Sequence, residues 1–296
     1  MKAKVSDKIF DVVNLIFVTL CLLIVLYPLI YVLSSSFSSP AAITGGKVRL
    51  LPIGFNINGY KAVFEHKQIW VGFKNSILYA GGMVFLNLIM TTMAAYPLSR
   101  KDFRQRNIVM YFFAFTMFFG GGLIPYYIVI KTLHMVNQPL VMIIPGAMSV
   151  FNLILMRTYI QTSIPESLQE AAFLDGCNDF RYLWSIVVPL SKPILAVISL
   201  YIAVASWNDY FTALIFINSD RLQPIQMILR SILVLNKVDE AMMSKIGDIK
   251  VLESRLGLQA LLKYSLIVTA SIPVLILYPF VQKYFVKGVT IGAIKG

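Results

Sequence analysis

Charged residues are scarce in this chain. Only 14% of its 296 residues are charged, whereas 58% are hydrophobic. A water-soluble domain usually has about 25% charged and about 45–50% apolar residues. The composition therefore excludes an ordinary soluble enzyme, and its high apolar content also excludes a disordered chain. The class that remains is an integral membrane protein.

Cysteines and catalytic motifs are also few. The two cysteines, Cys21 and Cys177, cannot form a disulfide framework. No group of His and Cys has the spacing of metal ligands, so we assign no metal site. The sequence contains no Gly-x-x-x-x-Gly-Lys-Ser/Thr loop and no recognisable pair of nucleophile and base. We expect a chain that is not an enzyme and binds no cofactor itself, so its energy comes from another subunit or an ion gradient.

What the chain has instead is a series of long apolar stretches. A membrane-spanning helix needs about 20 mostly apolar residues. Six stretches satisfy this, namely residues 12–34, 75–98, 108–130, 139–158, 185–209 and 262–283. The first is too long for the apolar part of a signal peptide, so we interpret it as a retained helix. The sequence thus predicts an all-α fold with six transmembrane helices.

The positive charges predict the orientation of these helices. The net charge is +12, and in a membrane protein such an excess usually fixes topology rather than indicating nucleic acid. The densest basic cluster, Arg100 to Arg106, lies in a short loop, where the positive-inside rule is strongest. With six helices both termini share the side of this loop, so we place them in the cytoplasm. The spans carry few ionisable groups, which disfavours a proton- or sodium-coupled carrier.

A polar segment between the fourth and fifth stretches carries the most specific signal. Ser163 and Glu166 have the spacing of a capping box, Pro165 suits a first helical turn, and Gly176 suits a helix end. We therefore expect a short amphipathic helix within 163–177, outside the bilayer, with one face formed by Leu168, Ala171, Ala172 and Asp175. It is either a docking element for a cytoplasmic partner or an interfacial helix that orders the loop.

The same segment resembles the signature of ABC importer permeases. The matching residues are Glu170-Ala171-Ala172, Asp175-Gly176, Pro189-Leu190 and Pro193. The resemblance implies that the short helix is a coupling helix that docks on an ATPase subunit. It further implies a docking role for the C-terminal tail. The implied ATPase-docking residues are Glu170, Ala171, Ala172, Asp175, Gly176, Gly292 and Lys295.

Further motifs resemble permeases of carbohydrate importers, in the branch that contains the second permease of the maltose system. They are Asn58-Gly59-Tyr60, Asn75-Ser76, Ala95-Tyr96, Leu98-Ser99-Arg100, Trp207-Asn208-Asp209 and the tail Gly288 to Gly296. The run Phe118 to Pro125 is similar to members associated with complex oligosaccharides. The resemblance implies a type I importer permease fold in a bacterial inner membrane.

The resemblance also implies partners and parts. The expected partners are a second homologous permease, two ATP-binding subunits that hold ATP and Mg, a lipid-anchored external sugar-binding protein and the bilayer, with no nucleic acid. The expected parts are 1–70 with the first helix and an outer loop, a permease core at 71–283, and a cytoplasmic tail at 284–296. An outer loop at 218–260 either delivers sugar from the binding protein or only caps the helix ends.

Several residues are candidates for a substrate path. Glycines 120–122 lie within the third stretch, where they either allow close helix packing or break the helix beside a pore. Asp209 is costly near a membrane segment and usually faces protein or water. The path candidates are Gly121, Tyr126, Tyr127, Trp207, Asn208, Asp209 and Tyr210, although aromatic residues there also suit the membrane interface. The alternatives to a sugar permease are a permease for another solute, a different membrane transporter and a scaffold.

Overall fold

The computed structural model of the chain describes residues 5–233 and 249–293. Every regular element within these ranges is helical, which confirms the expected all-α class. The chain divides into two compact units, one formed by residues 1–70 with 228–272 and the other by 71–227 with 273–296. Part of the C-terminal helix belongs to the first unit and part to the second.

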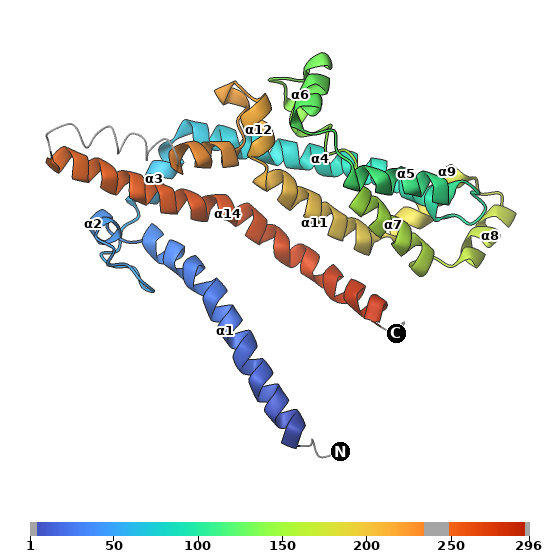
Figure 1. Cartoon of the computed structure of the whole chain (residues 1–296), viewed down its shortest axis with the longest axis horizontal. Coiled ribbons are helices and arrows are strands. Elements are labelled where there is room, and N and C mark those ends of the chain that lie inside the picture. Colours follow the sequence, from blue (N-terminus) through green and yellow to red (C-terminus); the bar gives the residue numbers. More distant parts are fainter. Residues whose placement is uncertain (1–4, 234–248, 294–296) are drawn as a thin grey trace. The chain divides into compact units, whose positions relative to one another are not determined.

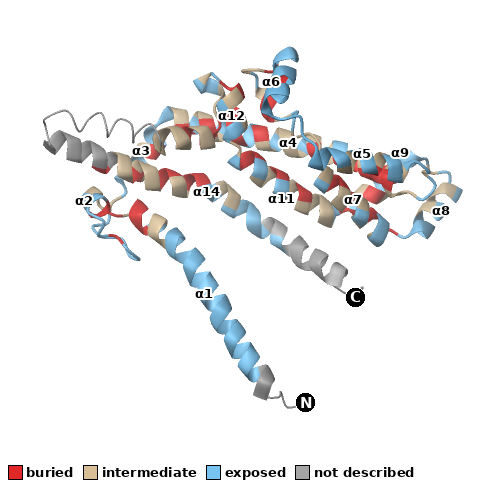
Figure 2. Cartoon of the chain, viewed as in Figure 1, coloured by how far each residue is buried: buried red, intermediate tan, exposed pale blue. Residues whose placement is uncertain are grey.

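The first unit begins with a long helix that makes few contacts within the chain. Helix α1 (Val5–Ser36) is exposed from residue 8 to residue 29, and these residues are almost all apolar (Figure 2). Apolar side chains that surround a helix on all sides suit lipid rather than water. Helix α1 is therefore long and apolar enough to cross a membrane.

The rest of the first unit forms a small core against α14 (Ile249–Ala293). Helices α2 (Pro40–Thr44) and α3 (Asn58–Glu65) belong to this unit, and Leu261 of α14 packs with Ala42, Ile43 and Val48. Gly59 lies so close to α14 that an added Cβ would be 2.9 Å from the Leu261 carbonyl oxygen. This close approach explains why glycine stands at the centre of the Asn58-Gly59-Tyr60 motif.

The second unit is organised along α4 (Lys67–Ser99) (Figure 1). Its other helical elements are α5 (Arg106–Phe118), α6 (Leu123–Thr132), η1 (Pro139–Met142), α7 (Val150–Ser163), α8 (Glu166–Leu174), α9 (Asp179–Tyr182), η2 (Leu183–Val187), α10 (Val188–Leu190), α11 (Lys192–Asn208), α12 (Phe211–Phe216) and η3 (Asp220–Leu222). One core joins the end of α4 to α7, η2 and α11, and a second joins the start of α4 to α6, η1 and α12.

Three of the expected spans are single helices in the structure. The helices Lys8–Ser36, Lys67–Ser99 and Gln259–Pro279 are long and apolar enough to cross a membrane. Two further spans are possible if each bent pair of helices is one span, α5 with α6 at 112° and Asp179–Leu190 with α11 at 78°. The described residues thus give three spans, or up to five, and the expected number of six is not confirmed.

The stretch 139–158 was expected as one helix, and that prediction is wrong. Only η1 and, from Val150, the 14-residue α7 are helical there. Pro145 and Gly146 interrupt the stretch. The carbonyl of Gly146 accepts a hydrogen bond from Nδ2 of the fully buried Asn87 at 2.9 Å. Because this side chain replaces the lost helical partner, the chain can leave the helix inside the protein.

The close approach at Gly59 gives a stability prediction. We expect Gly59→Ala to lower the unfolding free energy by about 1–3 kcal/mol, because the helices must separate to admit the methyl group. Gly81→Ala is the matched control, since nothing lies within 4 Å of a Cβ at that helical glycine. Thermal unfolding of both purified variants in detergent measures the difference. Equal melting temperatures would contradict the close packing of α3 on α14.

Candidate functional site

The short helix expected within 163–177 is α8, which spans Glu166–Leu174. The expected capping box is wrong, because Ser163 is the last residue of α7 and no side chain caps α8. Pro165 occupies the N-cap itself, with φ −63° and ψ 139°, rather than a position in the first turn. The proline therefore ends one helix and begins the next within two residues, which fixes a sharp corner between α7 and α8.

The expected helix end at Gly176 is confirmed. This glycine has φ +77°, and its amide donates to the Phe173 carbonyl at 3.0 Å. The amide of Cys177 donates to the Ala172 carbonyl at 2.9 Å. These two bonds form a Schellman motif, in which glycine is strongly favoured because other L-residues are strained at positive φ.

One face of α8 is exposed, as a docking element requires. Leu174 is 90% exposed, Leu168 is 37% exposed, and no residue of the helix is fully buried. Glu170, Ala171 and Asp175 are exposed as well. Ala172 differs from the prediction, because it turns inward with Phe173 and packs against the core. The exposed face thus combines apolar side chains with two acids.

The inner face of α8 is held by Arg100, which follows the end of α4. Its guanidinium makes an ion pair with Asp179 at the start of α9 and donates to the Tyr96 hydroxyl at 3.0 Å. It also lies over the ring of Phe173, with 5.2 Å from Cζ to the ring centroid. When the Gln169 amide is oriented with its oxygen toward Arg100, this oxygen accepts from Nη2 at 3.0 Å. One side chain therefore joins α4, α8 and α9.

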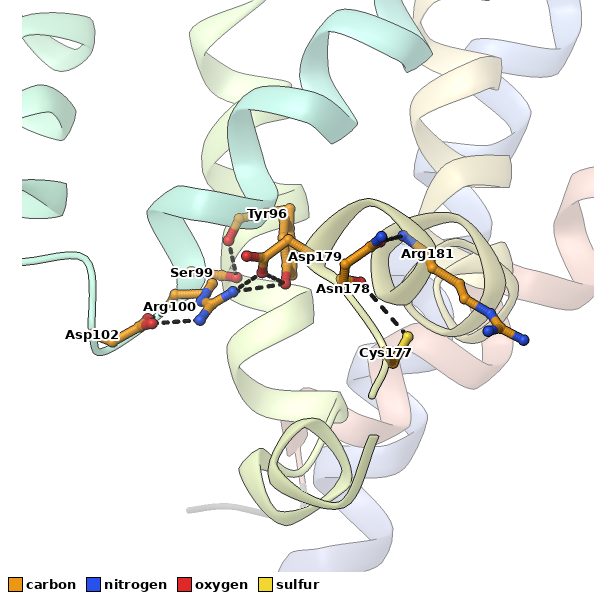
Figure 3. Close-up of polar contacts among 8 residues, drawn as sticks. All are labelled: Tyr96, Ser99, Arg100, Asp102, Cys177, Asn178, Asp179 and Arg181. Carbon is orange, nitrogen blue, oxygen red and sulfur yellow. Dashed lines mark hydrogen bonds and ion pairs between the residues drawn. The ribbon is translucent and has the colours of Figure 1, made fainter. Parts of the chain in front are cut away.

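The surroundings of Arg100 explain how a charge is accommodated there. The Arg100 side chain is only 14% exposed, and Tyr96 donates to Asp179 Oδ1 at 2.7 Å. Figure 3 shows the guanidinium between Asp102 on one side and Tyr96 and Asp179 on the other, with Arg181 pointing away. Hydrogen bonds from Arg100 lower the pKa of the exposed Asp102 carboxyl, and they raise the pKa of the guanidinium in return. Arg100 therefore stays charged at physiological pH.

A cavity of about 380 Å³ opens beside this cluster. Its lining includes Arg100, Arg106, Gln161 and Gln169, and Lys101, which forms an ion pair with Glu166. The cavity belongs to the second unit and lies against the same face of α8 that Arg100 holds.

Glycines 120–122 break the third stretch and are not closely packed within this chain. Gly122 has φ +80°, a value that glycine adopts without strain. Nothing lies within 4 Å of a Cβ added at Gly120 or Gly122, and Gly121 meets only Pro125. All three are exposed. The helix is discontinuous at an open position.

The aromatic path candidates of α6 meet α12. The rings of Tyr126 and Tyr127 lie 5.6 and 5.7 Å from the ring of the buried Phe216, and both tyrosines are more than one third exposed. The Tyr127 ring is stacked on Phe216, with 13° between the planes. A supported ring of this kind, with one open side, is a suitable surface for a sugar ring.

The candidates at 207–210 occupy different environments. Trp207 is 5% exposed and packs near Phe73, with ring centroids 6.0 Å apart, so the structure gives it a packing position. Asp209 accepts from the Thr212 amide at 3.0 Å, and Asn208 accepts from Gln226 at 3.4 Å. Tyr210 is 43% exposed. Asp209 thus helps to begin α12 and is satisfied by protein, as expected for an acid near a membrane segment.

The remaining predicted residues lie at the edges of the described chain. Gly292 belongs to α14, which continues as a helix to Ala293. The sequence predicted a helix only to residue 283, followed by a tail. Lys295 lies outside the described residues, as does the tip 236–248 of the predicted outer loop. Apolar residues at helical spacing in 222–235 and 249–262 predict two helices, and the described residues 225–233 and 249–262 are helical. Within the described ranges, no group of three or more His, Cys, Asp or Glu side chains could hold a metal ion.

Sequence reasoning missed the residues that hold α8 from behind. The sequence places Arg100 in the basic cluster and in the motif Leu98-Ser99-Arg100 but assigns it no structural role, and it does not single out Gln169, Phe173 or Asp179. A signal is present, because Arg100 belongs to that motif and directly follows an apolar stretch. What the sequence could not supply was the pairing of Arg100 with Asp179, which is 79 residues away.

Comparisons with known proteins find similar chains of known family. A polygalacturonan/rhamnogalacturonan transport system permease protein of Bacillus subtilis, YtcP, is 35% identical over 98% of this chain and 100% of its own length. Protein LplC of the same organism is 34% identical over 98% of this chain and 96% of its own.

A solved structure is also similar. It is a bacterial ABC transporter involved in the import of the acidic polysaccharide alginate, and one of its chains superposes with a TM-score of 0.84 at 35% identity, covering 96% of this chain and 99% of that one. The family described as binding-protein-dependent transport system inner membrane component matches residues 1–291. This chain therefore belongs to that family of membrane permease components of ABC importers.

Proposed function

We propose that this chain forms, with a second homologous permease, the path by which an oligosaccharide crosses the bacterial inner membrane. An external, lipid-anchored binding protein delivers the sugar, and two ATPase subunits that hold ATP and Mg supply the energy. This chain contributes no catalytic residue. The proposal is supported by relatives named for arabinooligosaccharide and maltodextrin transport, and by the similarity to the alginate importer.

The observation that carries the proposal is the exposed face of α8. A short helix with a fixed corner at Pro165 and a fixed end at Gly176 presents Leu174, Leu168 and Glu170 to the outside. Apolar side chains flanked by acids fit a cleft with an apolar floor and basic edges. We assign this cleft to the ATPase subunit, together with contacts from Gly292 and Lys295 of the tail.

The proposed topology has six spans with both termini in the cytoplasm. The cluster around Arg100 then lies on the cytoplasmic side with α8, and the segment from Asp209 to Leu222 lies outside. The loop 218–260 receives sugar from the binding protein. Closure of the ATPase pair moves α8 and turns the path outward, and hydrolysis returns it inward. Such alternating access requires that nucleotide and sugar stabilise different states.

The proposed path runs past Gly121 and the aromatic residues Tyr126, Tyr127 and Tyr210, with Asn208 and Asp209 as polar groups nearby. Exposed non-helical backbone at membrane depth is tolerated only beside water or protein, not beside lipid. The break at 119–122 is exposed within this chain, so a water-filled path or the partner permease must cover it. Trp207 supports the wall from behind rather than facing the sugar.

Reconstituted transport tests the proposal directly. We expect the complete importer in proteoliposomes to take up one oligosaccharide from a panel of galacturonan, arabinan and maltodextrin fragments. Uptake should require internal ATP and the binding protein, since each supplies a separate step. The control is an ATPase whose P-loop lysine is replaced. Uptake driven by an ion gradient without ATP, or uptake of only non-sugar solutes, would refute the proposal.

The helix end at Gly176 gives a sharper test of coupling. Gly176→Val should uncouple ATP hydrolysis from transport, because a β-branched residue at φ +77° costs about 1–2 kcal/mol and disturbs the end of α8. Gly176→Asn is the matched control, since asparagine tolerates this conformation and nothing lies within 4 Å of its Cβ. Stimulated ATPase activity and uptake are measured together. Equal coupling in the two variants would show that the geometry of this turn is unimportant.

The stacked ring of Tyr127 gives a test of the path. We expect Tyr127→Leu to reduce uptake about threefold to tenfold, because a ring contact is worth about 0.5–1.5 kcal/mol beyond its area. Tyr127→Phe keeps the ring and should retain most of the uptake. Initial uptake rates at rising sugar concentration separate weaker binding from slower transport. If leucine and phenylalanine behave alike, the ring does not contact the sugar.

A further inference from the structure

Helix α8 is attached to the second unit by few side chains. It has nine residues, none of them fully buried, and only Gln169, Ala172 and Phe173 are partly covered. An isolated helix of this length is not stable in water. The position of α8 therefore depends on the groups that its inner face contacts.

Two of the three inner side chains of α8 contact Arg100. The Gln169 amide, with its oxygen toward the guanidinium, accepts from Nη2, and the guanidinium lies over the Phe173 ring. The same guanidinium pairs with Asp179, which begins the next helix after the turn at Gly176. Arg100 thus binds residues of α8, before that turn, and Asp179 of α9, after it.

Arg100 itself is anchored to α4. Arg100 directly follows α4, and its guanidinium also donates to the hydroxyl of Tyr96, one turn earlier, at 3.0 Å. Tyr96 is 7% exposed and belongs to the main core of the second unit. The link from α8 therefore ends in a rigid, well-packed part of a long helix, not in a loop.

We propose that Arg100 is a positioning residue that fastens α8 and α9 to the end of α4, so that these elements move as one body when the ATPase displaces α8. The inference rests on the proposed docking of α8 and adds the route by which its motion enters the membrane. Arginine suits this role because its planar group has five donors in a fixed fork. Lysine keeps the charge but cannot make the same set of bonds.

Asp102 provides a matched control at the same guanidinium. It accepts hydrogen bonds from Arg100, but it lies two residues further along the chain and is exposed. Its carboxylate pairs with Arg100, and within the described residues no hydrogen bond or ion pair joins it to α8 or α9. Changing this carboxylate weakens two bonds of Arg100 that involve neither α8 nor α9. Asp179→Asn instead removes the ion pair between Arg100 and α9.

The experiment uses the complete importer with Arg100→Lys, Arg100→Gln, Asp179→Asn and Asp102→Asn. We expect the two Arg100 variants to lower the amount of solute imported per ATP about tenfold, because several charge-assisted hydrogen bonds are lost together. Asp102→Asn should behave as wild type. The double variant of Arg100→Gln with Asp179→Asn should be no worse than Arg100→Gln alone, because both changes break one link.

Amide hydrogen exchange supplies a second readout on the same complexes. Exchange in residues 166–179 should become faster in the Arg100 variants and in Asp179→Asn, with and without nucleotide, and should be unchanged in Asp102→Asn. This readout does not depend on which solute is carried, so it separates failure of the inference from failure of the proposed function.

The inference is wrong under any of three results. Assembled Arg100 variants could keep wild-type coupling and exchange, or Asp102→Asn could be as harmful as Arg100→Lys. The two Arg100 variants and Asp179→Asn could also fail to assemble while Asp102→Asn assembles. In that case Arg100 stabilises the fold and does not transmit the motion of α8.

Discussion

Backbone groups that leave a helix within a membrane must find partners in the protein, because lipid offers none. In the second unit α4 supplies such partners at successive levels. Asn75 near its start donates to two carbonyls of the segment 221–223, and Asn87 near its middle donates to the carbonyl of Gly146. Arg100 at its end holds α8 and α9. One long helix and the arginine that follows it thus hold three irregular segments. A shift of α4 would strain the hydrogen bonds to all three.

The helix breaks at Gly146 and at glycines 120–122 meet this constraint in different ways. Gly146 is half-buried, its carbonyl is bound by Asn87, and the side chain of Met83 occupies the space where a Cβ would stand. Glycines 120–122 have no such cover within the chain. A break whose backbone is bound by a side chain of the same chain serves the fold, whereas an open break requires something outside this chain. This contrast is why the break at 119–122, and not the one at Gly146, belongs to the proposed path.

The sequence predicted the elements that depend on local chemistry. Long apolar runs located α1, α4 and the membrane part of α14, and the glycine at 176 located the end of α8, because each signal is contained in neighbouring residues. The stretch 139–158 was misjudged since Pro145 and Gly146 were outweighed by their apolar neighbours. The role of Arg100 could not be predicted, because its partners are distant in sequence and an arginine beside an apolar run also satisfies the positive-inside rule.

The attachment of α8 combines weak packing with a strong polar joint, and this combination suits a part that must transmit force. Apolar contacts alone are not directional, so a helix held by Ala172 and Phe173 could slide over the core. Arg100 resists such sliding, because moving α8 away would leave a largely buried guanidinium with fewer partners, which is costly. The cheaper response is for the end of α4 to follow α8. A charge that is mostly enclosed and shared among three helices therefore converts a push on a surface helix into motion of a membrane helix.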